Sequence, residues 1–118
     1  WEQNILHYTE GVDYAQSIGA DVLIVLIPSK EEAYQAKLTD VYDAEYWAQV
    51  GESRTRLLAL CEENGWHCVD MLPHFERAIA DGETIYWGYD FHLDVSGNAL
   101  VAQVVDAYIR EHDFLAER

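Results

Sequence analysis

Hydrophobic residues along this chain predict two strands separated by helices. Asp21–Ile27 is a nearly continuous apolar, β-branched run that Pro28 ends, and Trp66–Met71 is a second, shorter one. Runs of this kind are typical of parallel strands that are covered on both faces. Apolar residues at helical spacing predict long helices over Trp1–Gly19, Ala44–Asn64 and Val95–His112, and short ones over Ser29–Gln35 and Pro73–Ala80. The order of these elements predicts an α/β fold, with a small parallel sheet flanked by helices on both faces.

Polar residues and glycines mark where several of these helices begin. Ser29 followed three residues later by Glu32 is a capping-box pattern, and Asp94 is placed to cap the last helix. Asp70, at the end of the second strand, is expected to be a helix cap or turn residue. Gly97 lies in the first turn of the last helix, where the missing side chain would allow backbone or substrate to approach closely.

Two strands are few for a parallel sheet, because the outer edge of each strand needs a neighbour or a cover. We therefore expect residues 1–118 to form a single domain that is part of a larger one. We also expect the edge of Val22–Ile27 to be covered, either by homo-oligomerisation or by a strand that another chain supplies.

Composition and charge narrow the classes of partner. A length of 118 residues suits one domain at most. Its 22 acidic residues against 7 Lys and Arg give a formal net charge of −15, and nucleic acids and anionic membranes repel such a protein. The longest apolar run, Val22–Ile27, is far shorter than the roughly 20 residues of a membrane-spanning helix. We expect neither a nucleic-acid nor a membrane partner.

The chain has two cysteines, Cys61 on the apolar face of a predicted helix and Cys68 inside a predicted strand. They form neither a CxxC motif nor a disulfide framework. Two buried core thiols are the interpretation that the sequence favours, and a single disulfide is the alternative.

Candidate chemistry is concentrated in the segment Trp87–Ala102. Asp90 and His92 lie two residues apart in a loop predicted over Gly88–Leu93. This spacing in an extended loop places both side chains on one side, whereas a helix would point them apart. A carboxylate that holds one ring N–H of a histidine orients it as a general base and stabilises the imidazolium that forms. An ordinary exposed polar loop is the alternative interpretation.

The same segment resembles the last motif block of the SGNH/GDSL hydrolases, in which an Asp-x-His or Asp-x-x-His stretch precedes a Gly-containing, apolar helix. The matching residues are Asp90, His92, Leu93, Gly97, Leu100, Val101 and Ala102. Upstream, Val22–Lys30 resembles the strand and Pro-Ser-Lys turn of the alginate-type O-acetyltransferases. Val69–Leu72 resembles the strand that precedes the final block.

The resemblance implies the C-terminal part of a five-stranded, flavodoxin-like SGNH hydrolase domain. It implies hydrolysis or transfer of an acyl ester through an acyl-serine, with His92 as the general base, Asp90 as its orienting carboxylate, and neither metal nor cofactor. The substrate that it implies is an ester of a carbohydrate or small alcohol. An extracytoplasmic location would fit the same family.

The motif of the serine nucleophile is missing, since the chain contains neither Gly-Asp-Ser nor Gly-x-Asn-Asp. None of its four serines, Ser17, Ser29, Ser53 and Ser96, is predicted to occupy the sharp strand-to-helix turn that presents a nucleophile. The nucleophile precedes Trp1 in the usual family order and follows Arg118 in the permuted alginate-type order. The polar tail after the last helix favours the first order. Either way, we expect the isolated chain to be catalytically inert.

Further residues near this block are candidates for substrate binding. Lys30 follows the end of the first strand, where α/β sheets place ligands, and suits an anionic substrate. An ordinary exposed basic side chain is the alternative that the sequence favours. Trp87, Tyr89 and Phe91 alternate, so in an extended stretch they would face one way, as a platform for a sugar or acyl group or as an anchor for the loop. Arg54 falls among apolar helix positions, where its stem is expected to lie along the core. The five histidines are scattered, and no metal site is predicted.

A second class of function remains open. The chain is alternatively a non-catalytic α/β interaction module that kept the fold and lost the site. Asp90 and His92 would then be ordinary loop residues.

Overall fold

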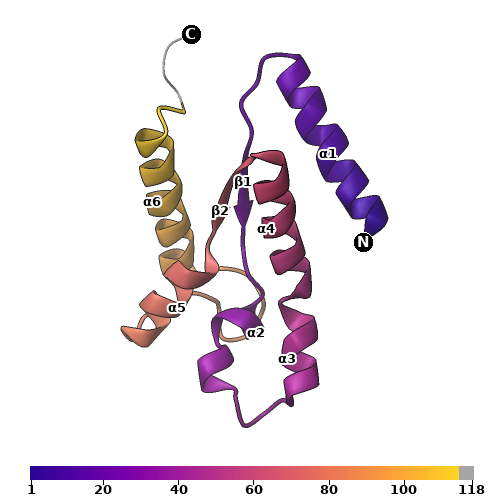
Figure 1. Ribbon diagram of the computed structural model, residues 1–118. Helices are drawn as coiled ribbons and strands as arrows, with labels where there is room; N and C mark the ends of the chain where they lie inside the picture. The colour runs from indigo at the N-terminus through magenta and orange to yellow at the C-terminus, as the bar shows by residue number, and fades with distance from the viewer. Residues whose placement is uncertain (115–118) are drawn as a thin grey trace.

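The computed structural model describes residues 1–114 and contains a pair of parallel strands with helices on both sides (Figure 1). β1 (Leu23–Leu26) and β2 (His67–Asp70) form the pair, with Leu26 opposite Asp70 at the carboxyl ends. The α/β fold class and the parallel sheet predicted from the sequence are confirmed.

Six α-helices surround the strands within the described residues. They are α1 (Glu2–Ser17), α2 (Lys30–Ala33), α3 (Ala44–Val50), α4 (Glu52–Asn64), α5 (Leu72–Ala80) and α6 (Val95–Glu111), with a 3-10 turn at Gln35–Lys37. The single helix predicted over Ala44–Asn64 is wrong, because the helix breaks at Gly51. Glycine is a weak helix former, and a side chain there would come within 3.3 Å of a Glu32 carboxylate oxygen. The break therefore lies where Glu32 approaches the helix.

The predicted helix starts are confirmed. The Ser29 hydroxyl accepts a hydrogen bond from the Glu32 backbone N–H at 3.2 Å, and the Glu32 carboxylate accepts from the Ser29 N–H at 2.8 Å. Asp94 accepts from the Gly97 N–H at 2.9 Å, and Asp70 accepts from the first N–H of α5 at 3.1 Å. The Ser29 and Asp94 caps satisfy backbone donors that helices leave unpaired, so they set where α2 and α6 begin. Asp70 acts as a turn residue instead, since the N-cap of α5 is Met71 and has no side-chain cap.

The helices α4 and α6 lie on opposite sides of the strand pair (Figure 1). On one side, Leu100, Val101, Val104 and Tyr108 of α6 pack with Leu23 and Val25 against the buried cluster. On the other side, α4 is joined to β2 by a disulfide between Cys61 and Cys68. Helices therefore cover both faces, as the continuous apolar strands predict.

The disulfide corrects the expectation of two free thiols. The two sulfur atoms lie 2.07 Å apart, with the Cα atoms separated by 6.3 Å. The geometry depends on Gly65, which ends α4 in the left-handed conformation, at φ 64°, and reverses the chain. The reversal brings the start of β2 back beside the last turns of α4, so two cysteines seven residues apart meet.

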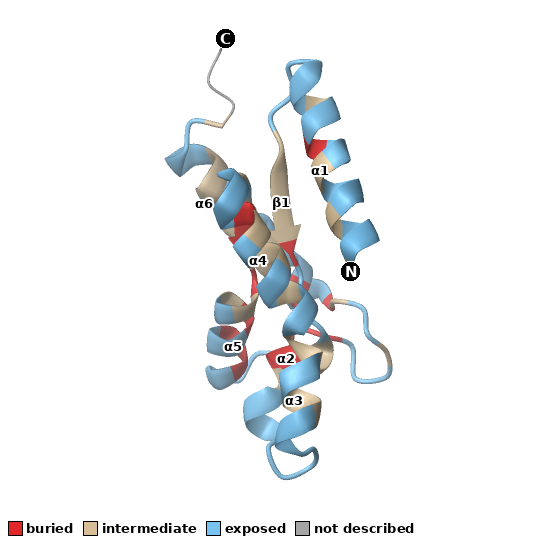
Figure 2. Cartoon of the chain, turned by 45° about the vertical axis from the view of Figure 1, so that its right-hand side comes forward, coloured by how far each residue is buried: buried red, intermediate tan, exposed pale blue. Residues whose placement is uncertain are grey.

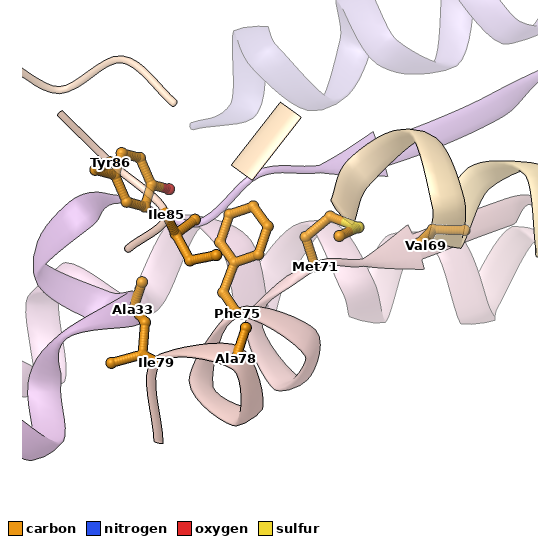
Figure 3. Packing of buried hydrophobic residues seen from close by; sticks show 8 residues of the cluster. All are labelled: Ala33, Val69, Met71, Phe75, Ala78, Ile79, Ile85 and Tyr86. Carbon is orange, nitrogen blue, oxygen red and sulfur yellow. The ribbon is translucent and has the colours of Figure 1, made fainter. Parts of the chain in front are cut away.

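The buried core lies at the carboxyl ends of the strands. Its fully buried side chains are Phe75, Met71 and Ile85. Figure 3 shows Phe75 in the middle of the cluster, between Ile85 and Met71, and its ring centroid is 5.9 Å from that of Tyr86. The core therefore supports the turns that leave the strands on this side.

The start of α6 packs directly on this core because Gly97 has no side chain. A Cβ atom on Gly97 would overlap the carbonyl oxygen of Ile85, which also accepts the Asp94 N–H at 2.8 Å. The predicted close approach of backbone at Gly97 is thus confirmed. Next to it, Tyr86 and Leu93 form an isolated antiparallel bridge, which closes the loop between them.

The molecule is more open than a compact domain. Its radius of gyration is 16.0 Å, against about 13.5 Å expected for a compact chain of this length. Figure 2 shows α1 almost entirely exposed, with Val12 as its buried residue. Ile18, the residue that follows α1, is 66% exposed. Within residues 1–114, no strand pairs with the outer edge of β1, and no helix is long and apolar enough to cross a membrane.

Candidate active site

The structure brings Asp90 and His92 together in the loop that precedes α6. Asp90 Oδ1 accepts a hydrogen bond from the backbone N–H of His92 at 2.9 Å, so the carboxylate bends the chain in an Asx turn. Asp90 Oδ2 lies 3.4 Å from His92 Nδ1. The two side chains therefore meet through a turn and not through the extended loop that the sequence predicts.

The geometry leaves one ring nitrogen of His92 available. Nδ1 faces the carboxylate, so Nε2 is the nitrogen that can exchange a proton with another group. The distance of 3.4 Å is longer than a hydrogen bond, as is common for catalytic pairs before substrate binds. The His92 side chain is 86% exposed and that of Asp90 is 35% exposed. The pair therefore lies at the surface and is open to a further group.

Lys30 holds this loop to the start of α2. Its ammonium donates hydrogen bonds to the carbonyl oxygens of Trp87, at 2.6 Å, and of Asp90, at 3.0 Å. The sequence placed Lys30 at the carboxyl edge of the sheet, as a contact for an anionic substrate. The structure confirms that place, and the contacts that it shows there are with the loop itself.

The aromatic residues of the loop do not share one face. The rings of Trp87 and Tyr89 stack, with centroids 5.8 Å apart and planes 23° apart. Tyr89 is 81% exposed. Phe91 instead lines a surface hollow of about 390 Å³. The remaining residues of that hollow are Lys30, Glu31, Tyr34, Lys37, Leu38 and Tyr42. The three rings do not face one way as an extended stretch would place them, because the segment turns.

A chain of charged side chains joins α2, α4 and the end of β2, and sequence reasoning missed it. Arg54 Nε lies 2.9 Å from Glu32 Oε1, and Arg54 Nη1 lies 2.7 Å from Asp70 Oδ2. All three side chains are largely buried. The sequence feature that pointed to this chain was Arg54, a charged residue among the apolar positions of its helix. That position predicted partial burial of Arg54, but it did not identify Glu32 and Asp70 as its partners.

The serines lie apart from this pair. Ser29 lies in the turn between β1 and α2. However, it adopts an ordinary extended conformation, φ −67° and ψ 159°, and acts as the cap of α2. Ser17, Ser53 and Ser96 are exposed on or beside helices. Among residues 1–114, none of these serines has a hydrogen bond to His92.

A metal-binding cluster is not found in the described part of the chain. No group of three or more His, Cys, Asp and Glu side chains there is arranged to hold an ion. Asp94, which alternates with Asp90 and His92 in sequence, is buried and caps α6.

Comparison with known proteins identifies the family. Residues 11–118, which are most of the chain, match the family described as the SGNH hydrolase-like domain of the acetyltransferase AlgX. No curated protein and no solved structure gives a significant match. The resemblance that the Asp-x-His block and the Pro-Ser-Lys turn predicted is confirmed. The chain belongs to the family of SGNH hydrolase-like domains of the acetyltransferase AlgX.

Proposed function

We propose that this chain supplies the general-base half of a serine acyl-transfer site, with His92 as the base and Asp90 as its orienting carboxylate. The observation that carries the proposal is the double contact of Asp90, through one oxygen with the backbone of His92 and through the other with its ring. Membership of an acetyltransferase family supports the same chemistry. A serine outside residues 1–118 is the nucleophile.

The proton movements follow from this geometry. His92 Nε2 accepts the proton of the serine hydroxyl as its oxygen attacks the acyl carbonyl, and Asp90 stabilises the imidazolium. The ester bond of the donor then breaks, and His92 returns the proton to the departing alkoxide. In the second half, His92 takes a proton from an acceptor hydroxyl or water as its oxygen attacks the acyl-serine. The bond to the serine oxygen then breaks, and His92 returns the proton to that oxygen. Each half returns His92 to its neutral form.

The family assignment changes the proposed place of the nucleophile. In the alginate-type order, the Asp-x-His block comes before the serine. We therefore place the serine after Arg118 in the natural polypeptide, and not before Trp1 as the polar tail suggested. On this proposal residues 1–118 are part of a larger SGNH-type domain, and the isolated chain is inert.

The surface around His92 suits an ester of a carbohydrate or small alcohol. The stacked rings of Trp87 and Tyr89, five and three residues before the base, form an apolar surface that can pack against a sugar ring or an acyl group. Lys30 has three ammonium donors and uses two of them on the loop, so one remains for a substrate oxygen.

The outer edge of β1 is the proposed place where the sheet continues. Leu23–Leu26 pairs on one side only among residues 1–114, and the molecule is more open than its length predicts. A further strand of the natural polypeptide, or a second copy of this chain, would satisfy its backbone groups. Light scattering of the isolated chain distinguishes these two alternatives. If the chain is a stable monomer, a second copy does not cover the edge of β1.

A fluorophosphonate probe, which labels activated serines, tests the proposal. The natural polypeptide that contains residues 1–118 is expected to be labelled, and the substitution His92→Ala to abolish labelling. The matched control is His7→Ala, because His7 is also an exposed histidine beside a carboxylate, with its Nδ1 3.8 Å from Glu10. The isolated chain is expected not to be labelled. Labelling of the isolated chain, or full labelling of the His92→Ala variant, would overturn the proposal.

One observation favours a second function. His92 is almost fully exposed and lies just beyond hydrogen-bond distance of Asp90, as in an ordinary surface loop. If neither the isolated chain nor the natural polypeptide is labelled, the chain is better described as a non-catalytic α/β interaction module.

A further inference from the structure

We propose that Lys30 is a positioning residue, which holds the Asp90–His92 loop in its working geometry from the carboxyl end of β1. The inference rests on the proposed role of His92 and adds a third residue to that site. It also assigns a function to the Pro-Ser-Lys turn at residues 28–30.

The contacts of Lys30 span the loop. Its Nζ bonds to the carbonyl of Trp87 before the turn and to the carbonyl of Asp90 inside it. The Trp87 N–H donates to the His92 carbonyl at 3.0 Å, so the loop is closed across its base as well. Lys30 binds the backbone carbonyl of Asp90, and the carboxylate that faces His92 belongs to the same residue. A shift of this carbonyl therefore also shifts the carboxylate. A charged donor forms stronger hydrogen bonds than a neutral one, which suits a single residue that restrains an exposed loop.

Lys30 is itself anchored on its N-terminal side. The preceding residue, Ser29, is fixed through its N–H to Glu32, and Glu32 is held by Arg54, which is held by Asp70 at the end of β2. The carbonyl of Pro28 accepts a hydrogen bond from the buried hydroxyl of Tyr86. The ammonium therefore extends from a rigid base that includes the ends of both strands. Its hydrogen bonds fix the loop relative to the sheet, although the loop itself has few buried residues.

The other lysine of the chain provides a matched control. Lys37 lines the same surface hollow as Lys30 and carries the same charge. Its ammonium lies 5.8 Å from the centroid of the Tyr34 ring. Among residues 1–114 it has no hydrogen bond to the loop. Lys37→Met therefore removes a neighbouring charge without releasing Trp87 or Asp90.

The experiment measures hydrolysis of 4-nitrophenyl acetate by the natural polypeptide. Lys30→Met is expected to lower kcat by about 10- to 100-fold, because small misplacements of catalytic groups have effects of that size. KM is expected to change less than kcat, since the stacked Trp87 and Tyr89 rings remain and the spare ammonium donor is the one substrate contact removed. Lys30→Arg should recover most of kcat, because a guanidinium can also donate to two carbonyls. Lys37→Met should match the unsubstituted protein.

Hydrogen exchange of the same proteins tests whether Lys30 restrains the loop or instead binds substrate. Amides of residues 88–92 should exchange faster in the Lys30→Met protein and not in the Lys37→Met protein, with the thermal midpoint of both near the original value. An effect on KM alone would show that Lys30 binds substrate instead, and equal loss of kcat in Lys30→Arg and Lys30→Met would also overturn positioning. If His92→Ala is inactive while Lys30→Met is fully active, this inference fails and the proposed function stands. If His92→Ala is fully active, both fail.

Discussion

The two ends of the strand pair are built from different interactions. At the amino end, β2 is joined to α4 by the Cys61–Cys68 disulfide, and His67 packs against aromatic rings at the end of α6. At the carboxyl end, Glu32, Arg54 and Asp70 form a largely buried chain of charges, and Lys30 extends from it to the loop of His92. One end relies on a covalent bond and ring contacts, whereas the other relies on charge and hydrogen bonds.

The amino end therefore holds helices α4 and α6 in place, whereas the carboxyl end carries the candidate catalytic residues. A disulfide stays in place whatever the protonation state of its surroundings, while charged contacts depend on the complete set of partners. The buried hydrophobic cluster around Phe75 lies at the carboxyl end too. The candidate site is thus carried by a rigid core, but its own alignment is set by polar groups that single substitutions can remove.

The largest effect is expected from removing the shared arginine at the carboxyl end. Arg54→Met leaves the largely buried Glu32 and Asp70 carboxylates without their common partner. We expect the free energy of unfolding to fall by about 3 kcal/mol, since breaking a buried ion pair leaves an uncompensated charge. Urea titration followed by circular dichroism measures this change.

The control is Arg110→Met, which removes an exposed ion pair with Asp106 at 2.8 Å on α6. Exposed pairs on helices contribute only about 0.3–0.5 kcal/mol. Similar losses for Arg54→Met and Arg110→Met would mean that the charges at the carboxyl end are no more than surface pairs. The contrast between the two ends would then be lost.

A smaller loss is expected at the amino end when the disulfide is removed. The double substitution Cys61→Ala with Cys68→Ala opens a short loop, since the cysteines are seven residues apart. Chain entropy for a loop of this length gives about 2 kcal/mol of stabilisation. Unfolding of the double variant in urea, and of the original protein with and without a reducing agent, measures it. A loss above that of Arg54→Met would reverse the proposed order of the two ends.

Most of the fold could be predicted because it depends on local patterns. The strands follow from continuous apolar runs, the starts of α2 and α6 from Ser29 and Asp94, and the close packing of α6 from Gly97. The break at Gly51 was missed, and the approach of a Glu32 carboxylate oxygen to within 3.3 Å of the position of a Cβ there joins two helices in a way that no local pattern indicates.

The candidate site was predictable in its residues but not in its contacts. Asp90 and His92 were found by spacing and motif, and the structure brings them together through a turn that the expected extended loop would not form. The partners of Lys30 lie 57 and 60 residues away in sequence, and those of Arg54 lie 16 and 22 away. No periodicity identifies contacts at such separations. The disulfide was underestimated for a similar reason, since it depends on the reversal at Gly65.

The smallest change probes one hydroxyl at the carboxyl end. The Tyr86 hydroxyl is buried and donates to the Pro28 carbonyl at 2.5 Å, just before the Ser29 cap. Tyr86→Phe removes this bond and leaves a buried carbonyl without that donor. We expect a loss of about 1 kcal/mol in the free energy of unfolding near neutral pH. Tyr108→Phe is the control at the amino end, where the hydroxyl meets the exposed His67 at 2.9 Å, and the expected loss is smaller.

The effect of Tyr86→Phe on the free energy of unfolding depends on pH, and the sign of this dependence follows from the pKa of the phenol. Burial raises the pKa of the Tyr86 phenol above its ordinary value of 10.0, and the negative charge of Glu32 raises it further. In the unfolded chain this phenol ionises near pH 10, while in the folded chain it keeps its proton. The stabilisation from Tyr86 is therefore complete below pH 10 and is lost above it, by up to about 1.4 kcal/mol per pH unit. Urea titrations from pH 9 to pH 11 should show the original protein losing stability faster than Tyr86→Phe, so that the difference between them shrinks. Parallel curves of stability against pH would mean that the Tyr86 hydroxyl is hydrated in the folded protein. Buried polar contacts would then stabilise the carboxyl end less than the comparison of the two ends implies.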